Sequence, residues 1–251
     1  MNGAVRQRKI REMLEGEEFL DLEALCKRLD ASESTVRRDL AALEHEGVLR
    51  RVYGGAMAIE PRDQTLDFAW QSTHMTDEKR RIAAATAKLL RDNETVILDG
   101  GSTVAEVARA LTDRSLHVIT NSLPIAELFS DSRQVEVTLT GGYLYPRLRA
   151  TLGPICEETL ASVSADTLVM GIGGVTEAGF SNNNSLVVGP ERKMIEACRR
   201  VIVVSDHTKF GHRSLLQVAP LDIADIVVSD SALKPEHQQM LRANNVEVIL
   251  A

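Results

Sequence analysis

The chain has 251 residues, a net charge of -7, 44% hydrophobic residues and 26% charged residues. That length allows one large domain or two unequal ones, and the composition excludes wholesale disorder. The acidic balance neither indicates nor excludes nucleic-acid binding, because affinity for phosphates depends on where the cations lie on the surface. No run approaches the roughly 20 apolar residues of a membrane span, and the charged N-terminus lacks the apolar stretch of a signal peptide. We therefore expect a cytoplasmic protein with no membrane partner.

Three cysteines, Cys26, Cys156 and Cys198, lie far apart, with no CxxC pair and no adjacent histidine. That pattern is typical neither of a disulfide framework nor of a structural zinc site. We expect small hydrophobic side chains at these positions, and we expect the protein to hold no metal and no cofactor.

Apolar residues recur at helical spacing in three stretches near the N-terminus, residues 5–15, 22–29 and 33–46. Asp21 and Ser32 precede the second and third stretches and are expected to be their N-caps. Gly47 is expected to end the third helix as its C′ residue. Two short strands are expected next, around the turn Tyr53-Gly54-Gly55.

Two short helices joined by a three-residue turn and followed by a hairpin are the layout of a winged helix-turn-helix, which we assign to residues 1–57. The second helix of the pair must bury one face and leave the other free for the major groove of double-stranded operator DNA. An isolated Arg37-Arg38 pair would more often be a solvated face with partners such as Glu33 and Glu44, but its position in this layout favours DNA binding. The residues expected to contact DNA are Ser34, Thr35, Arg37, Arg38, Arg50, Arg51, Tyr53 and Gly54.

Residues 58–76 show no clear period and are interpreted as a linker. From residue 77 to residue 251, short apolar runs alternate with helical patterns. The expected strands are 95–99, 116–120, 135–140, 166–172, 200–206, 225–230 and 246–250. The expected helices are 78–91, 103–111, 122–130, 154–161, 190–199 and 235–243. This alternation predicts a mainly parallel sheet covered on both faces, with a ligand site at the carboxyl ends of the strands.

Small and polar residues gather after these strands. A glycine- and hydroxyl-rich turn that opens a helix offers backbone N–H groups to a phosphate, and a lysine at another strand end can neutralise it. Any single turn of this kind is more often just a tight connection, but several at one edge favour a small, hydroxylated, anionic ligand. No GxxxxGK[ST] loop and no GxGxxG fingerprint occurs. The expected ligand contacts are Asp99, Gly100, Gly101, Ser102, Thr103, Asn121, Ser122, Gly141, Gly142, Gly173, Gly174, Asp206 and Lys209.

The segment 32–40 (SESTVRRDL), with Gly54-Gly55-Ala56 after it, resembles the DeoR family of transcriptional regulators, and the blocks at 99–103, 120–122 and 205–211 are similar to those of its second domain. The resemblance implies a sensor domain with the fold of ribose-5-phosphate isomerase and the CoA transferases. It also implies a homo-oligomeric repressor of a carbohydrate-catabolic operon that is relieved by a phosphorylated sugar. Ser102 stands where the family more often has threonine. A Glu-x-Lys block adds Lys193 to the expected ligand contacts.

An alternative is a sugar-phosphate isomerase or hydrolase with an appended helical domain, in which Asp99, Asp206 and Lys209 supply acid–base chemistry. We favour a regulator without catalytic residues, since no second acid–base pair is evident and a fused DNA-reading domain gives a binding site a purpose of its own.

Overall fold

The computed structural model describes residues 3–14, 19–46, 48–52, 54–58 and 67–251. The chain divides into two units, Met1–Gln71 and Ser72–Ala251, which are described separately. Gly47 and Tyr53, predicted as a helix end and a DNA contact, lie outside the described residues. Among the described residues, no helix combines the length and apolar character needed to cross a membrane.

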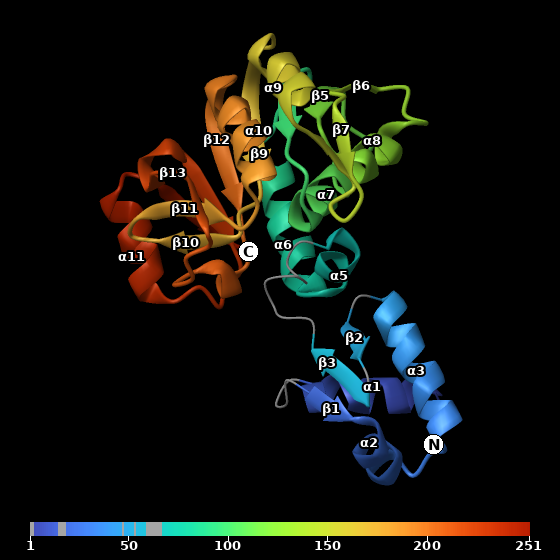
Figure 1. Ribbon diagram of the computed structural model, residues 1–251. Helices are drawn as coiled ribbons and strands as arrows, with labels where there is room; N and C mark the ends of the chain where they lie inside the picture. The colour runs from blue at the N-terminus through green and yellow to red at the C-terminus, as the bar shows by residue number, and fades with distance from the viewer. Residues whose placement is uncertain (1–2, 15–18, 47, 53, 59–66) are drawn as a thin grey trace. The chain divides into compact units, whose positions relative to one another are not determined.

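The first unit is a three-helix arrangement with a small antiparallel sheet (Figure 1). Its helices are α1 (Gly3–Leu14), α2 (Leu22–Leu29) and α3 (Glu33–His45). Its strands are β1 (Phe19–Asp21), β2 (Leu49–Val52) and β3 (Gly55–Ala58), in the order β1-β3-β2. The helical spacing buries the predicted apolar faces: Ile10, Leu25, Leu29, Val36, Leu40 and Leu43 form one core. The winged helix-turn-helix layout is therefore confirmed.

Local bonds set the ends of these helices. The Asp21 carboxylate accepts a hydrogen bond from the Ala24 N–H at 2.9 Å, as an N-cap should. Ser32 occupies the N-cap position of α3, but its hydroxyl is 2.8 Å from the Thr35 hydroxyl and makes no capping bond to the backbone. Helix α3 therefore starts where the sequence predicted, but without the predicted capping bond from Ser32.

The second unit is built on a seven-stranded sheet in which every paired strand is parallel (Figure 1). The strands are β4 (Thr95–Leu98), β5 (Leu116–Thr120), β6 (Val135–Leu139), β9 (Ala165–Met170), β12 (Cys198–Val204), β14 (Ile226–Ser229) and β15 (Glu247–Leu250). Their order is β15-β14-β12-β9-β4-β5-β6. All four residues of β14 are buried, so both faces of the sheet are covered there. The predicted α/β fold is confirmed, with each of the seven expected strands present.

The helices of this unit follow the expected alternation. They are α6 (Thr76–Ala87), α7 (Ser102–Arg109), α8 (Leu123–Phe129), α9 (Pro154–Ala161), α10 (Ser185–Glu196) and α11 (Pro235–Ala243). Helix α6 packs on α7, and α9 packs on α10. The prediction placed the start of α10 at residue 190, whereas the helix begins at Ser185, capped by the Asn184 side chain, with Pro190 inside it.

Two further features were absent from the prediction. Antiparallel strands form a sheet of β10 (Gly174–Thr176), β11 (Gly179–Asn182) and β13 (Leu216–Ala219) and a hairpin of β7 (Tyr143–Tyr145) and β8 (Ala150–Leu152). Helix α5 (Phe68–Thr73) lies in the segment interpreted as a linker. The Asp67 carboxylate accepts from the N–H of Ala69 at 2.9 Å, and this cap explains why a helix begins there.

Candidate functional site

The exposed face of α3 carries the residues expected to meet DNA. Ser34, Arg37 and Arg38 are exposed and Thr35 is half-buried, while Val36 on the same helix is fully buried. The Arg37 guanidinium lies 2.6 Å from the Glu33 carboxylate, so part of its charge is already neutralised. Arg38 makes no ion pair with any described residue, which leaves its donors available to a base edge or a phosphate.

The hairpin of β2 and β3, the wing of this domain, carries two arginines that differ in their contacts. Arg50 is exposed and forms no ion pair with a described residue. Arg51 is bound to Glu44 of α3: its backbone N–H donates at 2.8 Å and its Nε at 2.6 Å. The backbone bond and then the side-chain bond from Arg51 lower the pKa of Glu44. These bonds from Arg51 therefore hold β2 against α3. Gly54 has a φ of 84°, a value that favours glycine at this turn.

At the carboxyl edge of the large sheet, residues after the neighbouring strands β9, β4 and β5 come together. The Gly171 N–H donates to Asp99 Oδ2 at 3.3 Å, which joins the ends of β9 and β4. A Cβ on Gly100 would lie 3.2 Å from Asn121 Oδ1, so the ends of β4 and β5 also touch. Ser122 is fully buried and caps α8. The loop after β4 and the turn after β5 therefore lie side by side at this edge of the sheet.

A buried lysine that the sequence reasoning did not select enters this site from α6. Lys79 is only 6% exposed, and its Nζ donates to Ser102 Oγ at 2.9 Å, at the first residue of α7. Burial lowers the pKa of Lys79 to about 8, the charge of Asp206 opposes that shift, and the charge of Lys209 adds to it. Lys79 is thus bonded to Ser102 and is acted on by the charges of Asp206 and Lys209, and we call these four residues the anion site. In the sequence, Glu78-Lys79 is similar to a block of the family's second domain, but the helical pattern alone does not distinguish Lys79 from a surface lysine.

The start of α7 leaves room beside the anion site. Gly101 is the N-cap residue and makes no side-chain capping bond. A Cβ on Gly101 would have no heavy atom within 4 Å. Thr103 follows in the first turn and is buried. Backbone N–H groups at a helix start, next to open space and a lysine, suit a bound phosphate.

A second buried acid also lies in this region. Glu191 of α10 is 1% exposed, and its Oε1 accepts from Asn182 Nδ2 at 2.7 Å. Burial and then the charge of Asp99 raise the pKa of Glu191 well above its ordinary value. The predicted contact Lys193 lies on the same helix but is turned to Glu196, with the two charged groups 2.6 Å apart. Within the Glu-x-Lys block, the glutamate is thus the residue that is buried and acted on by the charge of Asp99, whereas the lysine pairs with Glu196.

The predicted glycine pairs are positions where the backbone passes close to another segment. Gly141 and Gly142 have φ values of 73° and 113°, and a Cβ on Gly142 would lie 2.7 Å from the Leu152 carbonyl oxygen. A Cβ on Gly174 would lie 2.3 Å from the His212 carbonyl oxygen, and one on Gly173 would lie 3.0 Å from Asn182 Oδ1. Close packing explains Gly142 and Gly174, whereas Gly173 also lies beside the side chain that holds Glu191.

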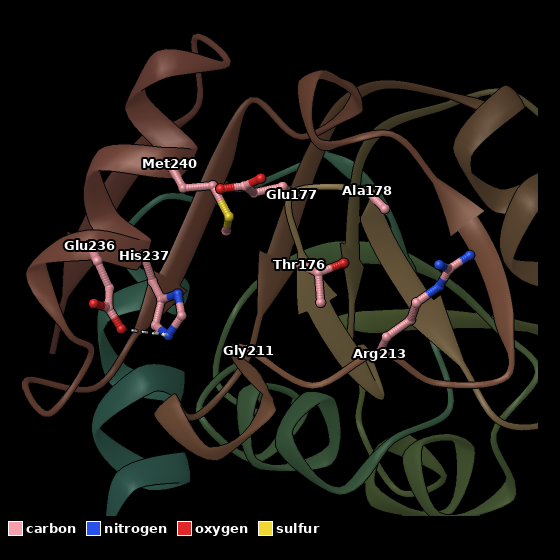
Figure 2. A pocket seen from close by; sticks show the side chains of 8 residues that line it. All are labelled: Thr176, Glu177, Ala178, Gly211, Arg213, Glu236, His237 and Met240. Atoms are coloured by element: carbon pink, nitrogen blue, oxygen red, sulfur yellow. Dashed lines mark ion pairs between the residues drawn. The ribbon is translucent and has the colours of Figure 1, made fainter.

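A separate pocket of about 590 Å³ lies between α11 and the β10–β11 turn (Figure 2). The residues that line it are Thr176, Glu177, Ala178, Gly211, Arg213, Glu236, His237 and Met240. None of the predicted ligand contacts is among these described residues. His237 packs its ring 5.6 Å from that of Phe210, centroid to centroid, at the edge of this pocket.

A winged helix-turn-helix, together with an α/β unit whose strand ends gather lysines, hydroxyls and open helix starts, defines a DNA-binding regulator with a sensor domain. Residues 6–62 match the DeoR-like helix-turn-helix domain and residues 74–231 match the DeoR C terminal sensor domain. The chain belongs to the DeoR family of transcriptional regulators, and it is a regulator and not an enzyme.

Individual relatives agree with this assignment. The HTH-type transcriptional repressor GlcR of Bacillus subtilis (strain 168) is 32% identical over 91% of this chain and 88% of its own length. The transcriptional repressor AccR of Agrobacterium fabrum is 34% identical over 91% of this chain and 90% of its own. Ribose 5-phosphate isomerase A of Methanocaldococcus jannaschii is similar in structure over 54% of each chain, with a TM-score of 0.40 and 17% identity. That last likeness is too slight to support a functional argument.

Proposed function

We propose that this protein represses a carbohydrate-related operon and releases its operator when a phosphorylated sugar or related metabolite, the effector, binds at the anion site. Residues 1–57 read the DNA, residues 58–76 connect the two parts, and residues 77–251 bind the effector. The names of the relatives GlcR and AccR, both repressors, support the direction of regulation.

One observation carries the choice of effector: buried Lys79 donates to Ser102 at the open start of α7, with Lys209 close by. A buried ammonium group is costly unless an anion compensates it. A phosphate can accept from Lys79, Lys209 and the N–H groups of α7 together. A phosphorylated sugar supplies negative charge to this ammonium group, whereas a neutral sugar supplies none.

Release of the operator by an effector requires that effector binding and DNA binding be coupled. A single helix-turn-helix contacts one half-site, and dimeric readers of this class bind two half-sites at a fixed spacing. We propose a homo-oligomer in which the effector favours an arrangement of the protomers that no longer fits this spacing.

The test starts from a duplex selected from a random DNA library on the full-length protein. Sugar phosphates are then titrated while DNA binding is followed by fluorescence anisotropy and protein stability by thermal unfolding. A true effector releases the DNA and raises Tm, since a ligand at 100 times its Kd adds about 2.7 kcal/mol. The proposal is wrong if no phosphorylated sugar does either, or if one turns over without affecting DNA binding.

A further inference from the structure

The sensor domain exposes most of its large apolar surface side chains in one region. They belong to the end of β6, to strand β7 and to the first turns of α9 and α10, and we call them the apolar surface: Leu139, Tyr143, Leu144, Ile155 and Leu186. Ile155 is 62% exposed and Tyr143 is 61% exposed. Among the other described residues of this unit, Leu215 and Leu250 are the large apolar side chains with comparable exposure.

Contacts between these elements make the apolar surface continuous. A Cβ on Gly141 would lie 3.9 Å from Ile155 Cγ2, so the chain after β6 meets the start of α9. Tyr143 is paired with Leu152, three residues before Ile155. Helix α9 packs on α10, and Val187 of α10 packs against the apolar cluster that contains Leu152. The five side chains therefore belong to neighbouring segments, although the sequence spreads them over nearly fifty residues.

The strands under the apolar surface are edges that other proteins usually protect. Strand β6 ends the seven-stranded sheet and β7 ends its two-stranded hairpin, so neither has a further strand on its outer side among the described residues. Exposed edges commonly carry lysine or proline, which discourage association, but neither strand contains either residue. Apolar side chains gathered at such edges mark a contact surface for protein, because burying them removes apolar area from water.

Charges of both signs border the apolar surface. Arg147 and Arg149 are exposed in the turn after β7, and Arg149 lies 3.3 Å from the exposed carboxylate of Glu127. Glu158 is exposed one helical turn after Ile155 and forms no ion pair with a described residue. A surface with a basic and an acidic border can complement a second copy of itself across a two-fold axis. Nucleic acid or an anionic membrane would match the basic border alone.

The hairpin that carries Tyr143 and Leu144 is also bonded to an expected ligand contact. The Thr151 N–H of β8 donates to the Asn121 carbonyl at 2.8 Å, and Asn121 Nδ2 donates to the Thr151 carbonyl at 3.2 Å. Strand β7 is therefore separated from Asn121 by one strand. The proposed function requires effector binding to change how the protomers are arranged. A second copy that docks on this hairpin meets that requirement, whereas an unrelated partner does not.

We propose that the apolar surface is the contact between the sensor domains of two copies of this chain, related by a two-fold axis. Each copy buries the same apolar side chains against its partner, and the basic border of one copy faces the acidic border of the other. This inference rests on the proposed function, which requires a homo-oligomer but leaves the contacting surface open.

Sedimentation velocity on the full-length protein, over a wide range of protein concentration, tests the proposal. Wild type should form a dimer or a larger oligomer. The double variant Ile155→Ser/Leu186→Ser should raise the dissociation constant of the sensor-domain contact at least about tenfold, because two apolar side chains are lost from each copy. The matched control is Leu250→Ser, at a similarly exposed position on β15, which ends the sheet on the side opposite β6. It should associate as wild type does.

Both substituted side chains are exposed in a single copy, so the double variant should keep the circular dichroism spectrum of wild type. If it unfolds, the single variants Ile155→Ser and Tyr143→Ser give the same comparison. A folded variant that associates as tightly as wild type overturns the inference. A wild-type chain that is monomeric, or that associates only with a different protein, also overturns it. Operator release by sugar phosphates is measured separately, so normal association of the double variant refutes this surface and leaves the effector proposal intact.

Discussion

Lys79 Nζ donates a hydrogen bond to Ser102 Oγ at 2.9 Å and so joins helix α6 to the first residue of α7. Both groups are buried, and the charge of Lys209 acts on the same ammonium group. The bond places the ammonium group at the N-terminus of α7, where the helix dipole is also positive. That arrangement opposes folding of the empty site and favours an anionic ligand.

Replacing this lysine should separate effector binding from DNA binding. Lys79→Met keeps the length of the side chain and removes its charge, so we expect effector affinity to fall at least about tenfold, since charge-assisted bonds are worth roughly 1.5–3 kcal/mol. Operator affinity without effector should stay unchanged. Titration of effector into a protein–DNA complex measures both. Lys88→Met, at the exposed end of α6, is the control and should behave as wild type. Normal release of DNA by Lys79→Met would contradict the anion site.

The pKa of Lys79 predicts how effector binding depends on pH. Burial lowers this pKa to about 8, so the lysine loses its proton at a pH where the free side chain would still be charged. Affinity for a phosphorylated effector should therefore fall as pH rises through about 8. Calorimetric titrations between about pH 7 and pH 9.5 should show this fall in wild type and not in Lys79→Met. A flat profile in wild type would show that the ammonium group does not contact the ligand.

A second pH effect concerns stability. Burial raises the pKa of Asp99 to about 6, above its ordinary value of 3.8. The folded state then binds the proton more tightly than the unfolded state, so stability is lost as pH rises between these two values. Urea unfolding should show wild type losing free energy of unfolding relative to Asp99→Asn over that range, with no further loss above it. The opposite slope would mean that the carboxylate is stabilised in its charged form.

Arg38 is expected to carry sequence readout. It is exposed on α3 and forms no ion pair with a described residue, unlike Arg37. Arg38→Ala should weaken operator binding by about 1–3 kcal/mol and relax preference at one base position, while effector binding stays normal. Anisotropy titrations on the selected duplex and its point variants measure this. Lys27→Ala, which removes a cation already paired with Glu23, should have the smaller effect. Unchanged specificity in Arg38→Ala would exclude α3 from base contact.

The ion pair between Arg6 and Asp39 should stabilise the first unit. Arg6 Nε donates to Asp39 Oδ2 at 2.7 Å, and both side chains are largely buried, so α1 is tied to α3. Arg6→Ala leaves a buried carboxylate and should cost about 3 kcal/mol or more of unfolding free energy. Arg11→Ala breaks the exposed pair with Glu46 and should cost less than about 1 kcal/mol. Urea unfolding followed by circular dichroism compares the two. Equal losses would show that the buried pair has no special weight.

Several predictions made from local pattern were correct. The spacing of Leu25, Leu29, Val36 and Leu40 predicted two buried helix faces, and both are found. Each of the seven apolar runs is a strand of the parallel sheet. A strand that is buried on both faces is a nearly continuous apolar run, so it can be identified from its own residues without knowledge of its neighbours. The three-residue strand β1 was missed, because its only reason to be extended is its pairing with β3, more than thirty residues away.

The same contrast holds at the site. The sequence by itself determined that Asp99, Ser102, Asn121 and Lys209 follow strands, and therefore that they share one edge of the sheet, because parallel strands end on the same side. Only the tertiary structure placed Lys79 against Ser102 and Glu191 in the field of Asp99. Both of these residues lie on helices, where their position in the repeat gives no indication of burial by a neighbouring helix or strand end. Their unusual pKa values arise from that burial, so they are properties of the assembled fold.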